Sequence, residues 1–359
     1  MGTLFRISEQ FGEESRRQAK SIADRQVEIA SWSRPGHFRR ALSDPWYVLL
    51  AQMQSNFFSA TVDFYRGRQI HTLLLPMTTG SVSSPMGLGS DSTPVQIKIW
   101  DTETYLSDSM QFFLEYACRL FPCGSYSLLP SFRGESPDTS HLSQFYQSEV
   151  EIPGYFCDAV TLAEEYVRYV CRHLFANCED SIANLDIDVS HVSKLSESTK
   201  PLPQITLDEA HTMLGDEYIE TDATHRFRSL TRKGERTLIR EFSGPVWLTK
   251  LDHLAVPFYQ GFADDGLKSA AAADLLMGIG ETIGLGERHA TTTQLRRALD
   301  LHQIEPKEYS WYLELRKFSP MVTSGYGLGV ERFFCWVLNC TDIRSCQIFP
   351  RMRGVNPEV

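Results

Sequence analysis

The stretch from Tyr126 to Ile152 constrains the chain most, because it has the pattern of an antiparallel β-hairpin with one charged face. Its first extended run ends in Phe132-Arg133-Gly134-Glu135, its second covers Gln144–Ile152, and the residues between them suit a loop. Because side chains alternate between the two faces of a strand, Arg133 and Glu135 share one face of the first run. The same alternation groups four side chains of the second run: Phe145, Gln147, Glu149 and Glu151.

So much charge beside an aromatic ring is costly on a folded surface unless the surface binds a charged, flat, polar ligand. A nucleotide suits these residue types: an arginine binds phosphate, a carboxylate accepts from an exocyclic amine and a ring stacks on the base. The remaining carboxylates suit Mg²⁺. An ordinary solvated hairpin with paired charges is the alternative that this stretch alone leaves open.

A second segment near the C-terminus, Ser324–Arg332, reads SGYGLGVER and is followed by an apolar run, Phe333–Leu338. Glycine at every second position allows close approach of the backbone. We expect this strand to pass into a helix near Leu328, with Arg332 in the first helical turn. The GxGxG spacing differs from the GxGxxG of dinucleotide-binding folds, too little chain remains for a βαβ unit, and there is no GxxxxGK[ST] phosphate loop.

Together, these two segments resemble motifs 2 and 3 of the class II aminoacyl-tRNA synthetases: an FRxE strand, a loop, a returning strand and GxGxGxER. Four further segments are similar to the asparaginyl/aspartyl branch of that family: Ser109–Glu115, Pro257–Gln260, Gly280–Arg288 and Asp342–Arg351. The similarity covers roughly residues 45 to 351. It implies an α+β fold of the class II synthetase type, in which helices flank an antiparallel β-sheet.

The resemblance also implies a reaction, the attack of an amino-acid carboxylate on the α-phosphorus of ATP to give an acyl-adenylate and pyrophosphate. Arg133 would contact the α-phosphate and the reacting carboxylate. Phe145 and Arg332 would enclose the adenine, Glu135 would accept a hydrogen bond from its amino group, and His141 would contact the γ-phosphate. Arg133 and Arg332 are therefore expected to be catalytic.

By the same resemblance, Glu281 would be catalytic and would hold Mg²⁺ with help from Asp274 or Glu149. Two acids near a triphosphate suit Mg²⁺, which takes oxygen ligands. A salt bridge is the alternative use of these carboxylates.

The amino-acid site is implied by four residues. Gln111 and Glu115 lie one turn apart on a helix predicted over about Asp108–Leu120, where they would hold the α-amino group and the side chain, or else be solvated. Arg288 would read the side-chain carbonyl or carboxylate, unless it pairs with a nearby acid such as Glu287, Glu281 or Asp274. Gly327 would line the same site.

Four departures from the family pattern leave the substrate open and the ATP site intact. The tandem basic residues of the motif 2 loop are reduced to Ser140-His141, and Gln144 stands where Glu usually precedes the Phe. The common GGSxRE becomes Gly284-Leu285-Gly286-Glu287-Arg288-His289, and Leu114 occupies the position of a Lys in aspartate-specific members.

The first third of the chain predicts an N-terminal helical extension over 1–43, followed by a catalytic domain over 44–359. Asp44-Pro45 starts a helix with Asp as N-cap and Pro at N1. Its buried side would hold Val48, Leu49, Phe57, Phe58, Val62 and Tyr65. The helix ends at Gly67 and a strand at Ile70–Leu75 follows, which resembles motif 1 and implies a homodimer. The loop Thr78–Pro94 is expected to be a lid near the amino-acid pocket.

The rest of the chain predicts a polar and helical insert over 178–241, which is irregular up to residue 205 and then helical behind a capping box at Thr206–Glu209. The other predicted elements are a helix over about Asp158–Phe175 with Asp158 as N-cap and a strand over Pro245–Thr249. A strand, a turn and a second strand are expected over Ala270–Ile283, and helices over about Thr293–Gln303 and Lys307–Phe318.

Composition limits the location and the partners. The 359 residues carry a net charge of -10, which argues against broad electrostatic binding of nucleic acid. The N-terminus lacks a signal peptide and no apolar run has the length of a membrane span. The eight cysteines include no CxxC pair, so we expect buried free thiols in a reducing cytoplasm.

The sequence therefore supports three functions. The first is an ATP- and Mg²⁺-dependent adenylating ligase that activates aspartate or a similar amino acid and transfers it to ammonia or a small amine. The second is an asparaginyl-tRNA ligase, or one that charges another carrier. The third is a non-catalytic paralogue that binds amino acid or nucleotide. Residues 1–43 are too short for the anticodon-binding OB-fold of this branch, so binding of tRNA is doubtful and the first function is preferred.

Overall fold

The computed structural model describes residues 36–351 except 84–87, 89–91 and 225–226. Most of the predicted N-terminal extension and part of the predicted lid loop therefore lie outside the described residues. The central sheet has eight strands, in the spatial order β1 (His71–Thr72), β5 (Ser125–Phe132), β6 (Gln144–Pro153), β13 (Thr323–Gly329), β12 (Gly280–Glu287), β11 (Ala272–Met277), β10 (Val246–Thr249) and β7 (Gln204–Thr206). The pairs from β5 to β10 are antiparallel, while the edge strands β1 and β7 pair in parallel. The predicted fold class is confirmed.

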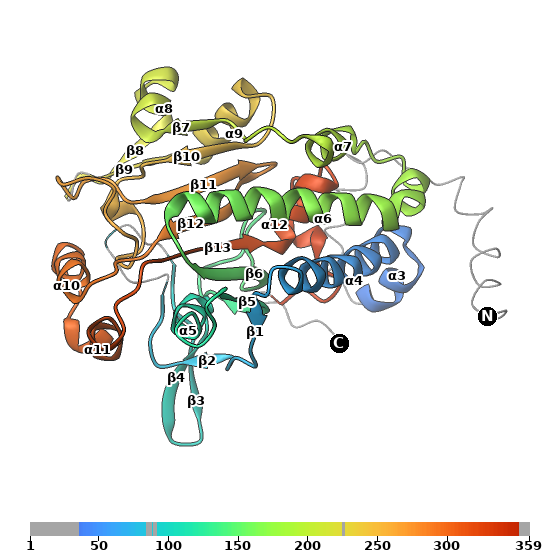
Figure 1. Ribbon diagram of the computed structural model, residues 1–359. Coiled ribbons are helices and arrows are strands. Elements are labelled where there is room, and N and C mark those ends of the chain that lie inside the picture. The colour runs from blue at the N-terminus through green and yellow to red at the C-terminus, as the bar shows by residue number, and fades with distance from the viewer. Residues whose placement is uncertain (1–35, 84–87, 89–91, 225–226, 352–359) are drawn as a thin grey trace.

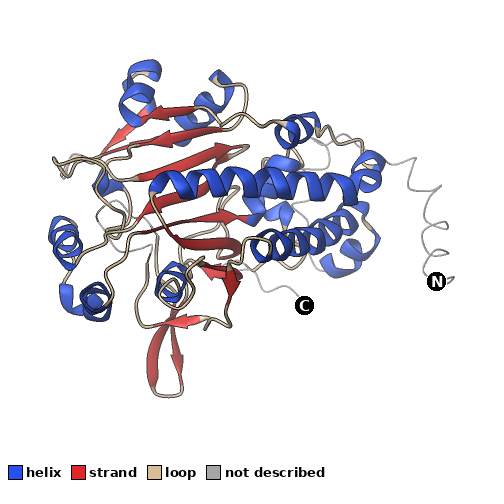
Figure 2. Cartoon of the chain, viewed as in Figure 1, coloured by secondary structure: helices blue, strands red, loops and turns tan. Residues whose placement is uncertain are grey.

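One face of the sheet is covered by three helices: α4 (Pro45–Arg66), α6 (Phe156–Asn184) and α12 (Val330–Val337). Figure 1 shows α6 running across the sheet with α4 beside it, and Figure 2 shows the same helices against the strands. Phe57 of α4 packs on Phe333 and Phe334 of α12, and Tyr166 of α6 stacks on Tyr65. This aromatic core supports the strands from one side and leaves the other face of the sheet for polar side chains.

The start of α4 follows from its sequence. Asp44 accepts a hydrogen bond from the backbone N of Trp46 at 2.9 Å, and the helix ends before Gly67, as predicted. The expected buried side is partly wrong, because Val48 is 49% exposed and Phe58 is 56% exposed. The strand predicted after this helix is reduced to the two residues of β1.

Two predictions for the middle of the chain need correction. Asp158 is not the N-cap of α6 but its third residue, and its carboxylate accepts from the backbone N of Tyr155 at 2.8 Å. The helix continues to Asn184, and α7 (Ser190–Glu197) follows, so residues 178–205 are not irregular throughout. The sequence did not predict these helical turns because their polar residues have the composition of a loop.

The capping box at Thr206 is confirmed. The hydroxyl of Thr206 accepts from the backbone N of Glu209 at 3.2 Å, and the carboxylate of Glu209 accepts from the backbone N of Thr206 at 2.9 Å. These contacts start α8 (Leu207–Leu214), and Gly215 ends it.

The remaining elements surround the sheet. A small sheet contains β2 (Thr78–Thr79), β3 (Gln96–Ile99) and β4 (Thr102–Leu106), and a hairpin pairs β8 (Ile219–Thr221) with β9 (Arg228–Leu230). The other α-helices of the described residues are α3 (His37–Ser43), α5 (Gln111–Ala117), α9 (Arg232–Glu241), α10 (Thr292–Leu301) and α11 (Ser310–Phe318). The helix predicted over Asp108–Leu120 is thus shorter, and β12 continues to Glu287, beyond the predicted end at Ile283. The strand β10 and the helix α10 match their predictions closely, whereas α11 begins three residues later than predicted. None of the helices in the described ranges could span a membrane.

Candidate active site

Two neighbouring cavities lie over the strands β6, β12 and β13. The larger has a volume of about 290 Å³ and the smaller about 80 Å³. Four residues line both cavities: Arg133, Gln147, Glu281 and Gly327. Because they share these residues, the cavities meet, and a ligand in one would touch a ligand in the other beside Arg133.

Alternation along β6 explains the polar walls. Ser148 faces the helices and hydrogen-bonds the hydroxyl of Tyr166 at 2.8 Å, while Glu149 and Glu151 lie on the other face of the strand and line the larger cavity. On β13, a Cβ at Gly325 would collide with the carboxylate of Glu151 and the backbone of Val150. The alternating glycines therefore provide the close backbone approach that the sequence predicted.

The smaller cavity is lined by the side chains predicted to bind ATP: Arg133, Glu135, His141, Phe145, Glu281 and Arg332. Nη1 of Arg332 donates to the backbone O of Glu281 at 2.5 Å, and Nη2 donates to the backbone O of Ser140 at 3.3 Å. The guanidinium of Arg133 lies 5.4 Å from the ring centroid of Phe145. Two cations and one aromatic ring thus face a single space, a combination of side chains that suits a nucleotide.

An arginine that the sequence did not suggest as a site residue contacts the loop after β5. Arg232, at the start of α9, places Nη2 3.0 Å from Nδ1 of His141 and donates from Nη1 to the hydroxyl of Ser140 at 2.8 Å. It lies 91 residues from His141 along the chain, so no local pattern could have assigned it. Glu135 accepts from the backbone N of Thr93 at 3.1 Å, which joins this loop to the predicted lid.

Asp274 and Glu281 form an acidic cluster with Glu235, a residue of α9 that the sequence did not suggest. Burial, followed by the charges of Glu281 and Glu235, raises the pKa of Asp274 well above its usual range. Burial and the charge of Glu281 raise the pKa of Glu235 to about 7. Carboxylates that repel one another gain from a divalent cation with oxygen ligands, so the charge of this cluster suits Mg²⁺. The three carboxylates do not form a compact metal-binding group within the described residues.

Glu149 lies far from Asp274. Asp274, Gly284, Gly327 and Glu149 are successive partners across β11, β12, β13 and β6. Three strand spacings separate the backbones of Asp274 and Glu149 by about 14 Å. Within the described residues, no compact group of metal-binding side chains combines the two. The geometry therefore separates Glu149 from Asp274 only. The expectation that Glu281 holds Mg²⁺ with help from either Asp274 or Glu149 stays a prediction, because Glu149 and Glu281 line the same cavity.

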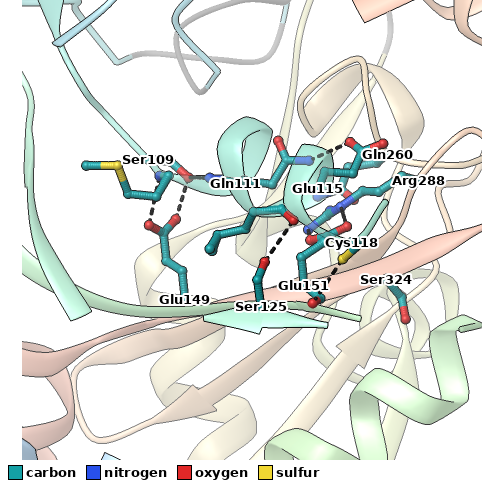
Figure 3. Close-up of polar contacts among 12 residues, drawn as sticks. Ser109, Gln111, Glu115, Cys118, Ser125, Glu149, Glu151, Gln260, Arg288 and Ser324 are labelled. Atoms are coloured by element: carbon teal, nitrogen blue, oxygen red, sulfur yellow. Dashed lines mark hydrogen bonds and ion pairs between the residues drawn. The ribbon is translucent and has the colours of Figure 1, made fainter. Parts of the chain in front are cut away.

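Glu149 lies instead at the end of the larger cavity near α5. Its carboxylate accepts from the hydroxyl of Ser109 and from the backbone N of Met110, the latter at 2.8 Å (Figure 3). Burial raises the pKa of Glu149 to about 7 despite these hydrogen bonds. Gln111, a predicted amino-acid ligand, lines the same cavity. A buried carboxylate beside a hydroxyl and an amide suits an ammonium group.

Arg288 is buried in the larger cavity and pairs with Glu151 rather than with the acids considered from the sequence. Nε and Nη2 of Arg288 donate to the two carboxylate oxygens of Glu151 at 3.0 and 2.9 Å (Figure 3). Nη1 donates to Oε1 of Gln260 at 2.5 Å. The side chains of Arg288 and Glu151 are 4% and 1% exposed. Arg288 is therefore fixed in place, and its two remaining N–H groups are the ones that could meet a ligand.

Glu115 lies behind the cavity wall, unlike the other predicted amino-acid ligands, and does not line either cavity. Its carboxylate is fully buried, pairs with Arg316 at 2.6 Å and with Arg119 at 3.3 Å, and accepts from the hydroxyl of Tyr312. Gln111 donates to it at 3.1 Å. The geometry does not favour direct contact of Glu115 with an amino acid, and instead gives it the role of positioning Gln111.

The expectation of buried free thiols holds for six cysteines, whereas Cys123 and Cys157 are exposed. The structure also brings together Cys335, Cys340 and Cys346, whose sulfur atoms lie within 4.8 Å of one another. Their spacing in the sequence gave no sign of this group.

Comparisons with known proteins agree with this geometry. Residues 42–353 match the family of class II tRNA synthetases (D, K and N). The asparagine–tRNA ligase of Thermococcus gammatolerans is 32% identical over 265 residues, which are 72% of this chain and 60% of the relative. That of Sorangium cellulosum is 28% identical over 318 residues, 84% of this chain and 69% of the relative.

Among solved structures, the asparaginyl-tRNA synthetase of Pyrococcus horikoshii complexed with asparaginyl-adenylate superposes with a TM-score of 0.80 at 26% identity, over 89% of this chain and 72% of that one. The chain spans about 60% of the length of the Thermococcus and Pyrococcus abyssi ligases it matches. The match over residues 42–353 covers the sheet, both cavities and the covering helices, and it shows that the chain belongs to the class II tRNA synthetase family of the D, K and N type.

Proposed function

We propose that the protein is an AMP-forming ligase of the asparaginyl-tRNA synthetase type, which activates asparagine with ATP and transfers it to tRNA or another carrier. The observation that carries this proposal is the junction of the two cavities at Arg133 and Gly327. A nucleotide in the smaller cavity and an amino acid in the larger would meet there. The relatives support this function over the amide-forming reaction with ammonia that the sequence alone favoured.

In the first step, an oxygen of the asparagine carboxylate attacks the α-phosphorus of ATP. A phosphorus–oxygen bond forms, the bond to the β-phosphate breaks, and pyrophosphate leaves with the electron pair. Arg133, at the junction, would balance the charge that develops on the α-phosphate, since phosphoryl transfer depends mostly on positioning and electrostatics. Phe145 and Arg332 would hold the adenine, and Glu135 would accept from its amino group.

Asp274 and Glu281 would hold Mg²⁺, with Glu235 close behind them. When bound, the ion neutralises phosphate charge and orients the leaving pyrophosphate. His141, with Arg232 beside it, would contact the far end of the triphosphate.

The relatives support asparagine over aspartate as the substrate, because they are asparagine–tRNA ligases. Glu149 and Gln111 would take the α-amino group, and the two remaining N–H groups of Arg288 would face the side chain.

We further propose that the protein is a homodimer through α4. Val48 and Phe58 of α4 are exposed, and Phe58 lines an apolar cavity together with Tyr146 and Phe349, which are 41% and 60% exposed. An exposed apolar patch of this kind is typical of an interface. Light scattering at micromolar concentration should give the mass of a dimer, and a monomer would contradict the proposal.

Two further segments keep the roles expected from the sequence as proposals. The loop Thr78–Pro94 is proposed as a lid, and residues 178–241 are proposed as an insert.

The test of function is ATP–pyrophosphate exchange screened across amino acids, followed by transfer to total tRNA and to hydroxylamine or ammonia. We expect exchange with asparagine, AMP as the nucleotide product and acid-stable asparaginyl-tRNA. ADP as the stoichiometric product would overturn the proposal. Exchange with aspartate and transfer to ammonia alone would restore the amide-forming function, and no exchange with any amino acid would favour a non-catalytic paralogue.

A further inference from the structure

Gln260 lies beside Arg288 in the larger cavity and has one hydrogen-bonding group unused. Its Oε1 accepts from Nη1 of Arg288 at 2.5 Å. Because a guanidinium only donates, the amide must turn its oxygen towards Arg288 and its Nε2 away. Among the residues that the structure describes, none accepts a hydrogen bond from this Nε2, although Gln260 is only 8% exposed and lines the cavity. A fixed donor thus faces the space that a ligand would fill.

Gly286 makes room for the side chain of Gln260. A Cβ at position 286 would lie 2.7 Å from Cδ of Gln260 and 3.2 Å from the backbone O of Ala271. Any side chain at this position would therefore push the carboxamide of Gln260 away from Arg288. This is the position at which the sequence has glycine in place of the serine of the common GGSxRE pattern.

The backbone of Gln260 is fixed by two buried histidines. Gln260 forms an antiparallel bridge with Arg288, and its backbone O accepts from Nε2 of His253 at 2.9 Å. Since Nε2 of His253 carries the proton, Nδ1 of this ring accepts, and Nε2 of His302 donates to it at 3.1 Å. Burial lowers the pKa of His253 to about 4, which keeps the ring neutral and this direction of donation intact near pH 7.

We propose that Gln260 is a specificity-determining residue whose Nε2 donates a hydrogen bond to the side-chain oxygen of the amino-acid substrate, with His253 and His302 as positioning residues. The inference rests on the proposed function and deepens it: the substrate side chain ends in an acceptor oxygen that lies between Gln260 and Arg288. An analogue without this oxygen leaves two buried groups unpaired, and a site of this kind discriminates strongly against such analogues.

The variant Gln260→Met tests the proposal, because methionine keeps the length of the side chain and removes both its donor and its acceptor. In pyrophosphate exchange we expect KM for asparagine to rise about tenfold, the scale of one hydrogen bond in a buried site, while KM for ATP is unchanged. The ratio of kcat/KM for asparagine to that for alanine should fall. The matched control Gln96→Met, on the exposed strand β3, should leave all three values unchanged.

Two further variants keep the test decisive. Gly286→Ala displaces the carboxamide of Gln260 without altering it, and should reproduce the rise in KM for asparagine if Gln260→Met fails to fold. His302→Gln should raise KM for asparagine a few-fold and leave KM for ATP unchanged, a split that a merely structural role would not produce.

The possible outcomes separate the two proposals. Wild-type enzyme that exchanges with no amino acid would overturn the proposed function and, with it, the role of Gln260. Wild-type enzyme that is active with asparagine, together with unchanged KM and unchanged discrimination against alanine in Gln260→Met and Gly286→Ala, would overturn the role of Gln260 alone.

Discussion

The substitution Arg288→Lys tests the centre of the proposed amino-acid site. Arg288 makes three buried hydrogen bonds, two to Glu151 and one to Gln260, and lysine can keep one of them together with the charge. Complete removal of one partner of a buried ion pair costs about 3–5 kcal/mol, because the other charge is left uncompensated. Since lysine retains the charge, we expect the free energy of unfolding to fall by about 2–3 kcal/mol.

The same change should weaken productive binding of asparagine by about 2–5 kcal/mol, the scale for truncating a hydrogen-bonded charge pair. The affinity for ATP should barely change, because Arg288 lines the larger cavity and not the smaller one. Urea denaturation, pyrophosphate exchange and titration with ATP measure the three quantities separately.

Arg66→Lys is the matched control. Arg66 donates to Asp63 at 2.6 Å on the surface, where the two side chains are 76% and 43% exposed, so the same substitution should cost less than about 1 kcal/mol. Equal stability losses in the two variants would refute the argument from burial. Wild-type enzyme that accepts alanine as readily as asparagine would show that Arg288 reads no side chain.

Three other predictions concern separate parts of the molecule. Burial raises the pKa of Glu331 from 4.5 to about 7, so the folded state binds this proton more tightly than the unfolded state. The free energy of unfolding therefore falls as the pH rises between those values. In urea titrations, Glu331→Gln should remove about 3 kcal/mol of this fall, and an unaltered pH profile would contradict the prediction. Phe145→Ala should weaken binding of ATP by about 1–3 kcal/mol, seen as a rise in KM for ATP, and leave KM for asparagine unchanged; equal effects on both would place the adenine elsewhere. Thr206→Ala should lower the free energy of unfolding by about 1 kcal/mol through loss of the cap, with exchange activity intact, whereas unchanged stability would show that the cap is dispensable.

The sequence predicted the parts of the fold that depend on local chemistry. Caps, glycines and strand alternation act within a few residues, which is why the start of α4, the capping box of α8 and the hairpin of β5 and β6 agree with their predictions. The extent of α6 was missed because tertiary packing stabilises its polar last turns. The burial of Val48 and Phe58 was wrong for a related reason, since periodicity identifies an apolar side chain but not what covers it.

The candidate site was predicted less completely, because its partners come from distant strands. Of the twelve site residues that the motifs named, eleven line the cavities, and Glu115 is the exception. Spacing along the chain could not show that Arg232 reaches His141 or that Glu235 joins Asp274, because each of these contacts depends on how α9 packs on the sheet.

The glycines of β12 and β13 show how the sheet register creates the site. Glu151, Gly325 and Gly286 are direct neighbours across β6, β13 and β12, and Arg288 follows Gly286 by two residues, so it points to the same face. With no side chain at Gly325, the guanidinium of Arg288 can reach Glu151 across the intervening strand. With none at Gly286, Gln260 can lie against the same guanidinium. In the proposed function, the alternating glycines would serve the recognition of the substrate side chain as much as the approach of ATP. A Cβ at either position would break a contact of Arg288.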